Sequence, residues 1–276
     1  ATGGGLPARA SGRRARTPVA DVVVVGAGYG GLSAALCLAA AGHRVRVFEG
    51  APGPGGKAGV AEVEGVEVDT GPSLMTLPTV FDELFRRAGT RLADEVRVRP
   101  LEPAFRYLWP DGTALDVSHD IDRTLGEVHD VLGPKAEAEL ADFLAYARRV
   151  WETAAPVFLR GAAPTFKRLA SMQSLRMVAK VDPLRSMLGA IDARVRSPYL
   201  RDLLMRHATY NGSDPRAAPA TLCCIAHVDL ALGGMGVEGG IHAMVRALVR
   251  VAERLGVRFE YDSWVERIEA GRVTVR

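Results

Sequence analysis

Cysteine, aromatic residues and net charge are all scarce in this chain. Its 276 residues include only three cysteines, aromatic residues make up 6%, and the formal net charge is +3. Cys37, Cys223 and Cys224 lack the number and spacing of a disulfide framework or a zinc site, which fits a reducing compartment. The small net charge excludes a nucleic-acid-binding protein that relies on bulk charge, so we expect no nucleic-acid partner.

Only one uncharged run, residues 22–42, is long enough to suggest a signal peptide or a membrane-spanning helix. Four glycines fall within six residues of it: Gly26, Gly28, Gly30 and Gly31. They would cost a continuous helix roughly 1 kcal/mol each. The β-branched residues Val22–Val25 instead predict a buried parallel strand, so a strand, a turn and a helix are favoured. Residues 1–20, rich in glycine, alanine and arginine, are then expected to form a disordered leader.

The glycine cluster has the pattern of a dinucleotide-binding fingerprint. It follows the predicted strand and opens a predicted helix over about 30–41, after which a second strand is expected at 45–48. The glycines permit a tight turn and close backbone approach, and the helix N-terminus favours phosphate. Glu49 closes the second strand, where a carboxylate accepts hydrogen bonds from ribose hydroxyls and disfavours NADP. The predicted phosphate-binding residues are Gly26, Gly28, Tyr29, Gly30 and Gly31.

A second glycine-rich segment, Pro54–Lys57, follows Glu49 within eight residues. Taken alone, such a segment is simply a loop. After a ribose-binding acid it is similar to the extension of flavoproteins of the glutathione-reductase-like class, in which a second loop reaches the diphosphate of FAD. The expected cofactor is therefore FAD, with these further ligands: Gly55, Gly56 and Lys57.

Several segments together resemble the carotenoid desaturases, of the phytoene and hydroxyneurosporene type. The matching segments lie at 26–49, 55–59, 68–73, 208–215 and 236–241, and the resemblance covers roughly residues 20–276. It implies that the turn from Asp69 to Ser73, including Gly71, Pro72 and Ser73, lies near the flavin and that the backbone of Val265 meets the adenine ring. A strand valine is more commonly a core residue.

The resemblance also implies the fold class, an α/β Rossmann-like FAD-binding domain interrupted by a mainly helical α+β substrate domain. The expected domains are the FAD-binding parts at 20–72 and 220–276 and the substrate domain at 73–219. Helices are expected at 121–132, 134–152, 165–178, 183–206 and 241–255. Further strands are expected at 95–99, 105–109, 257–261, 264–268 and 272–275.

The resembled family is nearly twice as long as this chain and carries a second glycine-rich FAD motif in its C-terminal part. Here the sequence stops at Arg276, inside a predicted strand. We therefore expect the chain to be the N-terminal portion of such a protein, with its second FAD-binding part incomplete.

Positive charge is concentrated in one segment, residues 148–206. It holds twelve Lys or Arg against four Asp or Glu, a local net charge of +8. The arginines alternate with leucine, methionine and phenylalanine, which is typical either of ordinary helices with solvated arginines or of a surface that lies on an anionic bilayer. If the substrate is a polyene dissolved in the membrane, the two interpretations of this segment are equally favoured. We expect a cytoplasmic protein bound peripherally to the inner face of the membrane.

The implied activity is desaturation of a carotenoid polyene, with a hydride passing to the flavin. The sequence assigns no catalytic acid or base and no metal ligand. Cys223, Cys224, His207, His227 and His242 are interpreted as packing or surface residues. The alternatives are another FAD-dependent oxidoreductase, of amine-oxidase-like or polyprenyl reductase type, and a non-catalytic FAD-binding fragment. An amine oxidase would need an aromatic cage, for which few aromatic residues are available here.

Overall fold

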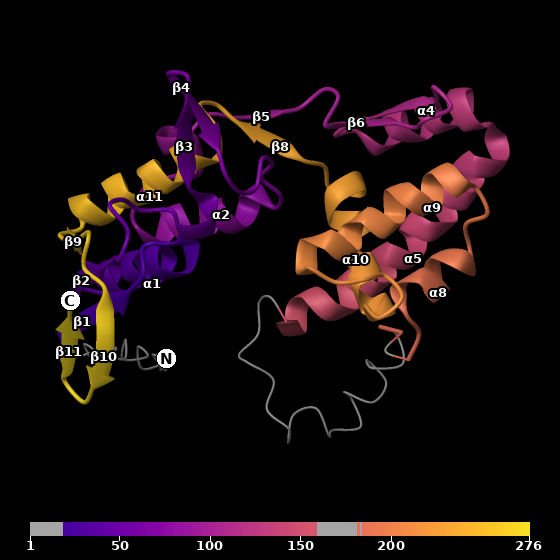
Figure 1. Cartoon of the computed structure of the whole chain (residues 1–276). Coiled ribbons are helices and arrows are strands. Elements are labelled where there is room, and N and C mark those ends of the chain that lie inside the picture. The colour runs from indigo at the N-terminus through magenta and orange to yellow at the C-terminus, as the bar shows by residue number, and fades with distance from the viewer. Residues whose placement is uncertain (1–18, 159–180, 183) are drawn as a thin grey trace, which may run out of the picture.

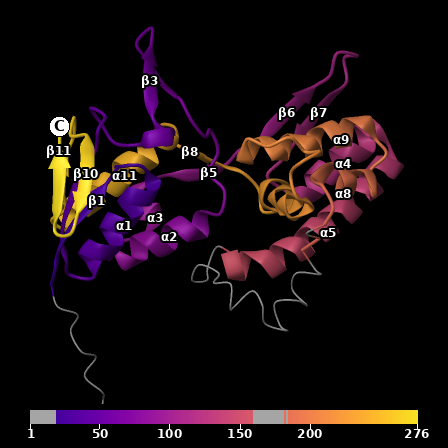
Figure 2. The ribbon, with the colours of Figure 1, turned by 60° about the horizontal axis from the view of Figure 1, so that its bottom comes forward.

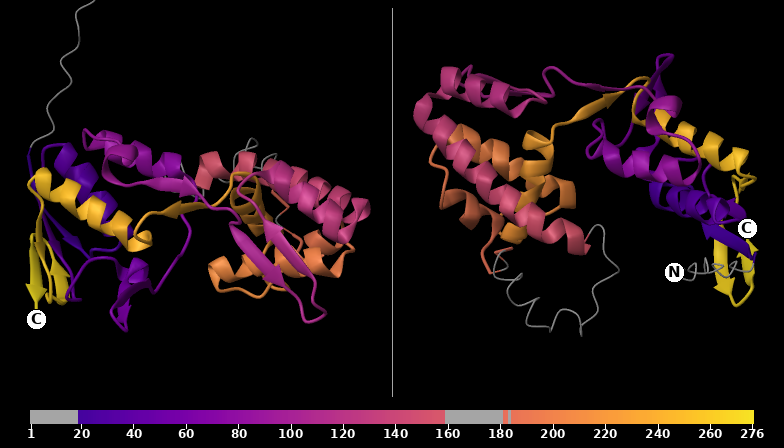
Figure 3. Two further views of the ribbon diagram at one scale, coloured as in Figure 1. Left: turned by 90° about the horizontal axis from the view of Figure 1, so that it is seen from above. Right: turned by 180° about the vertical axis from the view of Figure 1, so that it is seen from behind.

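The computed structural model describes residues 19–158, 181–182 and 184–276. The elements form two groups, each around its own hydrophobic core. The antiparallel strands β5 (Val98–Pro100) and β8 (Met235–Val237) lie between the two groups (Figure 1; Figure 3). Nearly all of the expected leader, and the helix expected at 165–178, lie outside the described residues.

The first group contains a parallel sheet of three strands in the order β1-β2-β9. Their bounds are β1 Asp21–Val25, β2 Arg44–Phe48 and β9 Arg258–Glu260, close to the strands expected from the sequence. Two helices pack against each other and bury their apolar faces in the core of this group (Figure 2), namely α1 Tyr29–Ala40 and α11 Ile241–Arg254. Alternate residues of β2, Val45 and Val47, are buried in that core, as expected for a strand that packs one face on helices.

The sheet is covered less completely than the sequence suggested. The run of four valines in β1 predicted a strand buried on both faces, but Val23 is 41% exposed and Val25 is 48% exposed. Val22 and Val24 pack against the core, because alternate side chains of a strand point to opposite faces. Within the described residues, β1 is an edge strand that pairs only with β2, so the prediction of a fully buried strand was wrong.

Further elements extend the first group. The side chain of Phe85, in α2 (Pro78–Arg87), is fully buried in this core. The hairpin of β10 (Val265–Glu269) and β11 (Arg272–Val275) confirms the two strands expected last in the sequence. The additional elements are η1 Gly56–Ala58, β3 Val60–Val63, β4 Val66–Asp69, α2 Pro78–Arg87, α3 Leu92–Glu95, β10 Val265–Glu269 and β11 Arg272–Val275.

The second group is mainly helical, with one antiparallel hairpin beside the helices (Figure 2). Its core includes the fully buried side chains of Phe143, Leu203 and Leu204. Its elements are β6 Phe105–Leu108, β7 Ala114–Val117, α4 Ile121–Leu132, α5 Pro134–Phe158, α8 Met187–Asp192, α9 Pro198–Met205, η2 Arg206–Asn211, η3 Ala220–Cys223, α10 Cys224–Ala226 and η4 His227–Ala231.

The packing places the boundaries between the groups further along the chain than 73 and 219. Helices α2 and α3 contribute Phe85 and Leu92 to the core of the first group. In the other direction, Cys223 and Leu230 belong to the core of the second group. The chain crosses from the first group to the second after β5 and returns at β8.

Three expected elements differ in extent. The helix expected at 183–206 is divided into α8 and α9, because Ser197 accepts the N–H of Leu200 and caps a new helix that begins with Pro198. The helix expected at 134–152 continues to Phe158. The strand expected at 95–99 is replaced by the end of α3 and by β5.

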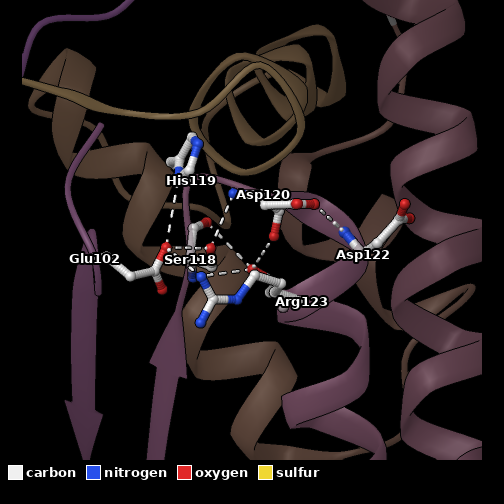
Figure 4. Close-up of polar contacts among 7 residues, drawn as sticks. Glu102, Ser118, His119, Asp120, Asp122 and Arg123 are labelled. Atoms are coloured by element: carbon white, nitrogen blue, oxygen red, sulfur yellow. Dashed lines mark hydrogen bonds and ion pairs between the residues drawn. The ribbon is translucent and has the colours of Figure 1, made fainter. Parts of the chain in front are cut away.

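A polar cluster marks the point where the chain enters the second group (Figure 4). Glu102 lies just after β5, and its Oε2 accepts hydrogen bonds from Ser118 Oγ at 2.7 Å and from His119 Nδ1 at 3.3 Å. Arg123 lies 3.4 Å from the same oxygen. Because the carboxylate stands between the hydroxyl and the imidazole, the two are not arranged as a nucleophile and its base. The hydrogen bond from Ser118 contributes most to the lowered pKa of Glu102.

Candidate active site

The first glycine loop joins β1 to α1. Gly26 has a φ of +93°, which glycine adopts without strain, and its N–H donates to Phe48 O at 2.7 Å. A side chain on Gly31 would place Cβ 1.8 Å from Gly26 O, so the helix passes as close to the strand as the sequence predicted. Gly28 is the N-cap of α1 and offers no side chain to its first amides. That turn therefore presents backbone N–H groups and the positive end of a helix dipole.

Glu49 fixes the other side of this loop. Its Oε2 accepts the N–H of Ala27 at 2.6 Å, and its Oε1 accepts the N–H of Ala51 at 2.9 Å. Each carboxylate oxygen has two lone pairs, so both oxygens keep acceptor capacity for a ribose hydroxyl. The acid is half-buried at the carboxyl end of β2, where ligands bind in parallel sheets of this kind.

The second glycine loop lies against the first. Gly55 N–H donates to Ala27 O at 2.9 Å, and Gly28 and Gly55 form an isolated parallel bridge. A Cβ on Gly56 would lie 3.4 Å from the Cα of Gly28, so the two backbones are in contact. Lys57 is exposed beside them. The structure thus brings together the two glycine segments that the sequence analysis paired.

The segment after β4 runs beside the second loop. Thr70 N–H donates to Gly59 O at 3.0 Å. A Cβ on Gly71 would lie 1.8 Å from Lys57 O, so only glycine fits there. Gly71, Pro72 and Ser73 are exposed. Their backbone therefore borders the loop while their surfaces remain open.

Val265 lies further along, at the start of β10. Two residues before it, Ser263 N–H donates to Glu49 O at 2.8 Å. Trp264 packs on Gly50, where an added Cβ would lie 2.6 Å from the indole ring. Val265 therefore begins close to Glu49 in the chain's fold, two residues after this hydrogen bond.

Tyr29 connects α1 with α11. Its hydroxyl donates to Ile241 O at 3.3 Å, and its ring meets Phe81 edge to face at 5.6 Å between centroids. Burial, followed by the negative charge of Asp69, raises the pKa of Tyr29 to about 12. The phenol is therefore neutral and acts here as a hydrogen-bond donor.

The side chains of two residues at this site have roles that the sequence did not predict. The carboxylate of Asp69 accepts the N–H of Ile241 at 2.7 Å and the N–H of His242 at 3.0 Å. The side chain of His242, interpreted as packing, lies 2.9 Å from Ala58 O through Nδ1. One signal was available: α11 begins after Gly239-Gly240, which offer no capping side chain, so an acceptor had to come from elsewhere.

A second polar cluster lies in the helical group, and one of its members, Tyr210, belongs to a segment of the desaturase resemblance. Asp229 accepts hydrogen bonds from Arg206 at 2.7 Å, from His207 at 3.2 Å and from Tyr210 at 3.0 Å. Arg206 also donates to the Tyr107 hydroxyl at 2.6 Å. Burial raises the pKa of Tyr210 to about 12. The cluster is internally satisfied and ties β6 to η2 and η4.

Among the described residues, the glycine loops form a site suited to an anionic dinucleotide. The described residues contain no group of three or more His, Cys, Asp or Glu side chains that would hold a metal ion. None of their helices has the length and apolarity needed to cross a bilayer. A cradle of backbone amides, glycines without Cβ atoms and the Glu49 carboxylate fits FAD.

Comparisons with known proteins agree with this site. A family model described as flavin containing amine oxidoreductase matches residues 29–276, which confirms the FAD predicted from the sequence. The hydroxyneurosporene desaturase of Rhodobacter capsulatus is 36% identical over 258 residues, 92% of this chain and 52% of the relative. The 4,4'-diapolycopene oxygenase of a Methylomonas species is 34% identical, over 90% of this chain and 50% of the relative.

The fold is shared with solved structures. A Pyrococcus furiosus protein superposes with a TM-score of 0.61 at 20% identity, over 94% of this chain and 55% of the other. The chain spans about half the length of the curated relatives it matches. With a cofactor-binding α/β fold and a family match over nearly the whole chain, this protein belongs to the flavin containing amine oxidoreductase family.

Proposed function

We propose that this chain takes part in FAD-dependent desaturation of a carotenoid polyene such as phytoene or hydroxyneurosporene. The observation that carries the proposal is the alignment of 92% of the chain with a hydroxyneurosporene desaturase at 36% identity. The paired glycine loops support it, because they build a site for a flavin dinucleotide. The oxygenase relatives support a second candidate, oxidation of a carotenoid with oxygen incorporation.

The proposed FAD ligands are those predicted from the sequence, and the geometry of the two glycine loops supports this site. The backbone around the first loop and the N-terminus of α1 would hold the diphosphate, and the Glu49 carboxylate would accept the ribose hydroxyls. The second loop would complete the diphosphate site, and the segment after β4 would border the flavin. The full proposed set is Gly26, Gly28, Tyr29, Gly30, Gly31, Glu49, Gly55, Gly56, Lys57, Gly71, Pro72, Ser73 and, at the adenine ring, Val265.

When bound, FAD supplies the hydride acceptor that no amino-acid side chain provides. The chain's own residues bind and orient the reactants and exclude water from them. We assign no catalytic acid or base. Glu49, Asp69 and His242, which lie at the glycine loops, are all hydrogen-bonded to backbone groups.

The mainly helical group is the proposed substrate domain. We propose that its basic segment, residues 148–206, contacts the cytoplasmic face of the inner membrane. Several described arginines of this segment are paired with carboxylates inside the chain: Arg148 with Glu152, Arg185 with Asp182, Arg194 with Asp142, Arg201 with Asp192 and Arg206 with Asp229. Arg196 contacts a carboxylate through its backbone instead: its N–H donates to the side chain of Glu139. Sedimentation with anionic and with neutral vesicles tests the contact; equal binding to both, or none, contradicts an electrostatic attachment.

The function is tested by mixing the FAD-loaded chain with a carotenoid polyene in the absence of oxygen. Desaturation predicts loss of the visible absorption of oxidised flavin together with a longer-wavelength spectrum of the polyene. Bound FAD that the polyene does not reduce would contradict turnover by this chain and favour a non-catalytic FAD-binding role. Reduction by an amine in place of the polyene would favour an amine oxidase. A product that gains oxygen when oxygen is present would favour the second candidate.

A further inference from the structure

We propose that Asp69 is a positioning residue for the second FAD-binding loop, acting through helix α11 and His242. The inference rests on the proposed FAD site and assigns a role to residues outside the set predicted from sequence. Asp69 ends β4, and its carboxylate accepts two backbone N–H groups at the start of α11, from Ile241 at 2.7 Å and His242 at 3.0 Å.

The start of α11 depends on this distant acceptor. Its N-cap, Gly240, supplies no side-chain acceptor, and the first turn contains no acidic residue. The first amides of a helix have no partners inside the helix, and a carboxylate there satisfies them and complements the helix dipole. Gly240 has a φ of +83°, and a Cβ on it would lie 2.7 Å from Asp69 Oδ2, so the carboxylate and the helix start fit closely.

His242 carries this arrangement on to the loop. Its side chain is buried, and Nδ1 lies 2.9 Å from Ala58 O. A carbonyl oxygen only accepts hydrogen bonds, so Nδ1 bears the hydrogen. The edge of the ring also lies against Gly55, where a Cβ would be 3.2 Å from Cε1 of His242. The imidazole therefore fixes two points of the loop that contains Gly55 and Ala58.

A second connection runs along the main chain. Asp69 is followed by Thr70, whose N–H donates to Gly59 O, and by Gly71, which packs on Lys57 O. The loop is thus held at one side by the residues after Asp69 and at the other by His242. From Gly55 the contact continues to Ala27 O in the first glycine loop. Movement of α11 relative to β4 would displace the loop against the first fingerprint.

A cap that only stabilises α11 would have a different consequence from a cap that positions the loop. Loss of any helix cap lowers the stability of the protein, whereas only loss of a positioning residue weakens FAD binding in molecules that remain folded. Asp120 provides a matched control, because it caps α4 in the helical group by accepting the N–H of Asp122 at 3.0 Å (Figure 4). Both positions are aspartates that cap a helix, but only Asp69 is near the glycine loops.

The experiment compares Asp69→Ala, Asp69→Asn, His242→Ala and Asp120→Ala in the 276-residue chain. Urea unfolding of FAD-free protein gives stability, and quenching of flavin fluorescence gives the Kd for FAD. We expect Asp69→Ala and His242→Ala to raise the Kd by about tenfold or more, which corresponds to roughly 1.4 kcal/mol. Asp69→Asn, which keeps one acceptor oxygen, should lose less affinity. Asp120→Ala should lower stability and leave the Kd unchanged.

The outcomes separate two failures. If wild-type protein binds FAD and Asp69→Ala binds it equally well while being destabilised like Asp120→Ala, Asp69 is only a helix cap and the proposal is overturned. If Asp69→Ala does not fold, His242→Ala and Asp69→Asn test the proposal instead. An unchanged Kd for FAD in both of these variants overturns the proposal. Wild-type protein that fails to bind FAD contradicts the proposed FAD site itself, and the role of Asp69 with it.

Discussion

Arg206 donates a hydrogen bond of 2.7 Å to Asp229, whose side chain is only 1% exposed. The guanidinium lies 4.5 Å from the centroid of the Phe105 ring, so it is held between an aromatic face and a carboxylate. His207 and Tyr210 donate to the same carboxylate. Since the buried Asp229 carboxylate is the shared acceptor of these donors, removing its charge leaves Arg206 and the buried His207 without their partner.

Removal of the Asp229 charge should make stability less dependent on acid pH. Burial alone would raise the pKa of Asp229, but hydrogen bonding and charge from His207, with the charge of Arg206, outweigh it and lower that pKa. A carboxylate with a lowered folded-state pKa stabilises the protein above its ordinary pKa of about 4, and this stabilisation is lost as the pH falls through the folded-state value. We expect Asp229→Asn to cost about 3–5 kcal/mol at pH 7.

Urea unfolding between pH 7 and pH 2 measures the difference in free energy of unfolding between wild type and Asp229→Asn. This difference should narrow as the pH falls below about 4, because Asp229 of the wild type then becomes protonated and loses its charge. Asp116→Asn is a matched control, since Asp116 pairs with Arg106 at the surface and surface pairs contribute about 0–1 kcal/mol. A difference that stays constant down to pH 2 would show that the charge of Asp229 is not what stabilises the cluster.

Glu49→Ala should weaken FAD binding more than removal of a neighbouring surface acid. Glu49 accepts two backbone N–H groups and would accept the ribose hydroxyls, whereas Glu260 pairs with Arg46 at the surface. Hydrogen bonds to a charged group contribute about 1.5–3 kcal/mol, so we expect the Kd to rise by roughly 10- to 150-fold. Fluorescence titration of Glu49→Ala and Glu260→Ala checks this, and equal affinity in the two variants would exclude Glu49 from the ribose site.

Two adjacent glycines of α1 should respond in opposite directions to the same substitution. A Cβ on Gly31 would lie 1.8 Å from Gly26 O, whereas a Cβ on Gly30 meets nothing within 4 Å. Gly31→Ala forces the helix from the strand and should cost about 1–3 kcal/mol. Gly30→Ala should stabilise the FAD-free protein by about 0.5–1 kcal/mol, because alanine has the better helix propensity. Urea unfolding measures both, and equal effects would contradict the close packing at Gly31.

Cys223 and Cys224 should react slowly with thiol reagents in the folded protein. Burial raises the pKa of Cys223 to about 12 and that of Cys224 to about 11. Because the thiolate is the reactive species, a thiol with pKa about 12 is ionised in roughly one molecule in ten thousand at pH 8. A chromogenic disulfide reagent should label the Cys37→Ser variant only after denaturant is added. Rapid labelling of the native variant would show that these thiols are accessible.

The sequence predicted the local elements around the glycines well. Gly26, Gly31 and Gly42 indicated where a strand turns, where a helix packs closely and where it ends, and the structure has β1, α1 and β2 in those places. These predictions succeeded because they depend on steric effects between neighbours in the chain. The division of the expected 183–206 helix was missed, although Ser197-Pro198 is a local signal for a new helix.

Contacts between distant residues were beyond the sequence. Asp69 and Ile241 are separated by 172 residues, and no spacing rule predicts that a carboxylate at the end of one strand caps that helix. The exposure of Val23 has the same origin, because burial of a strand face depends on which other segments cover it.

The sequence by itself determined the dinucleotide fingerprint, the carboxylate of Glu49 at the end of β2 and the cofactor, because backbone freedom and hydrogen-bonding capacity are properties of single residues and short segments. Only the tertiary structure decided that α2 and α3 join the first core and that residues 220–230 join the second. It also decided that Asp69 accepts the first amides of α11 and that His242 contacts Ala58 beside the second glycine loop. Those outcomes depend on packing between segments far apart in the chain, where many apolar and polar partners are chemically equivalent until the fold brings particular ones together.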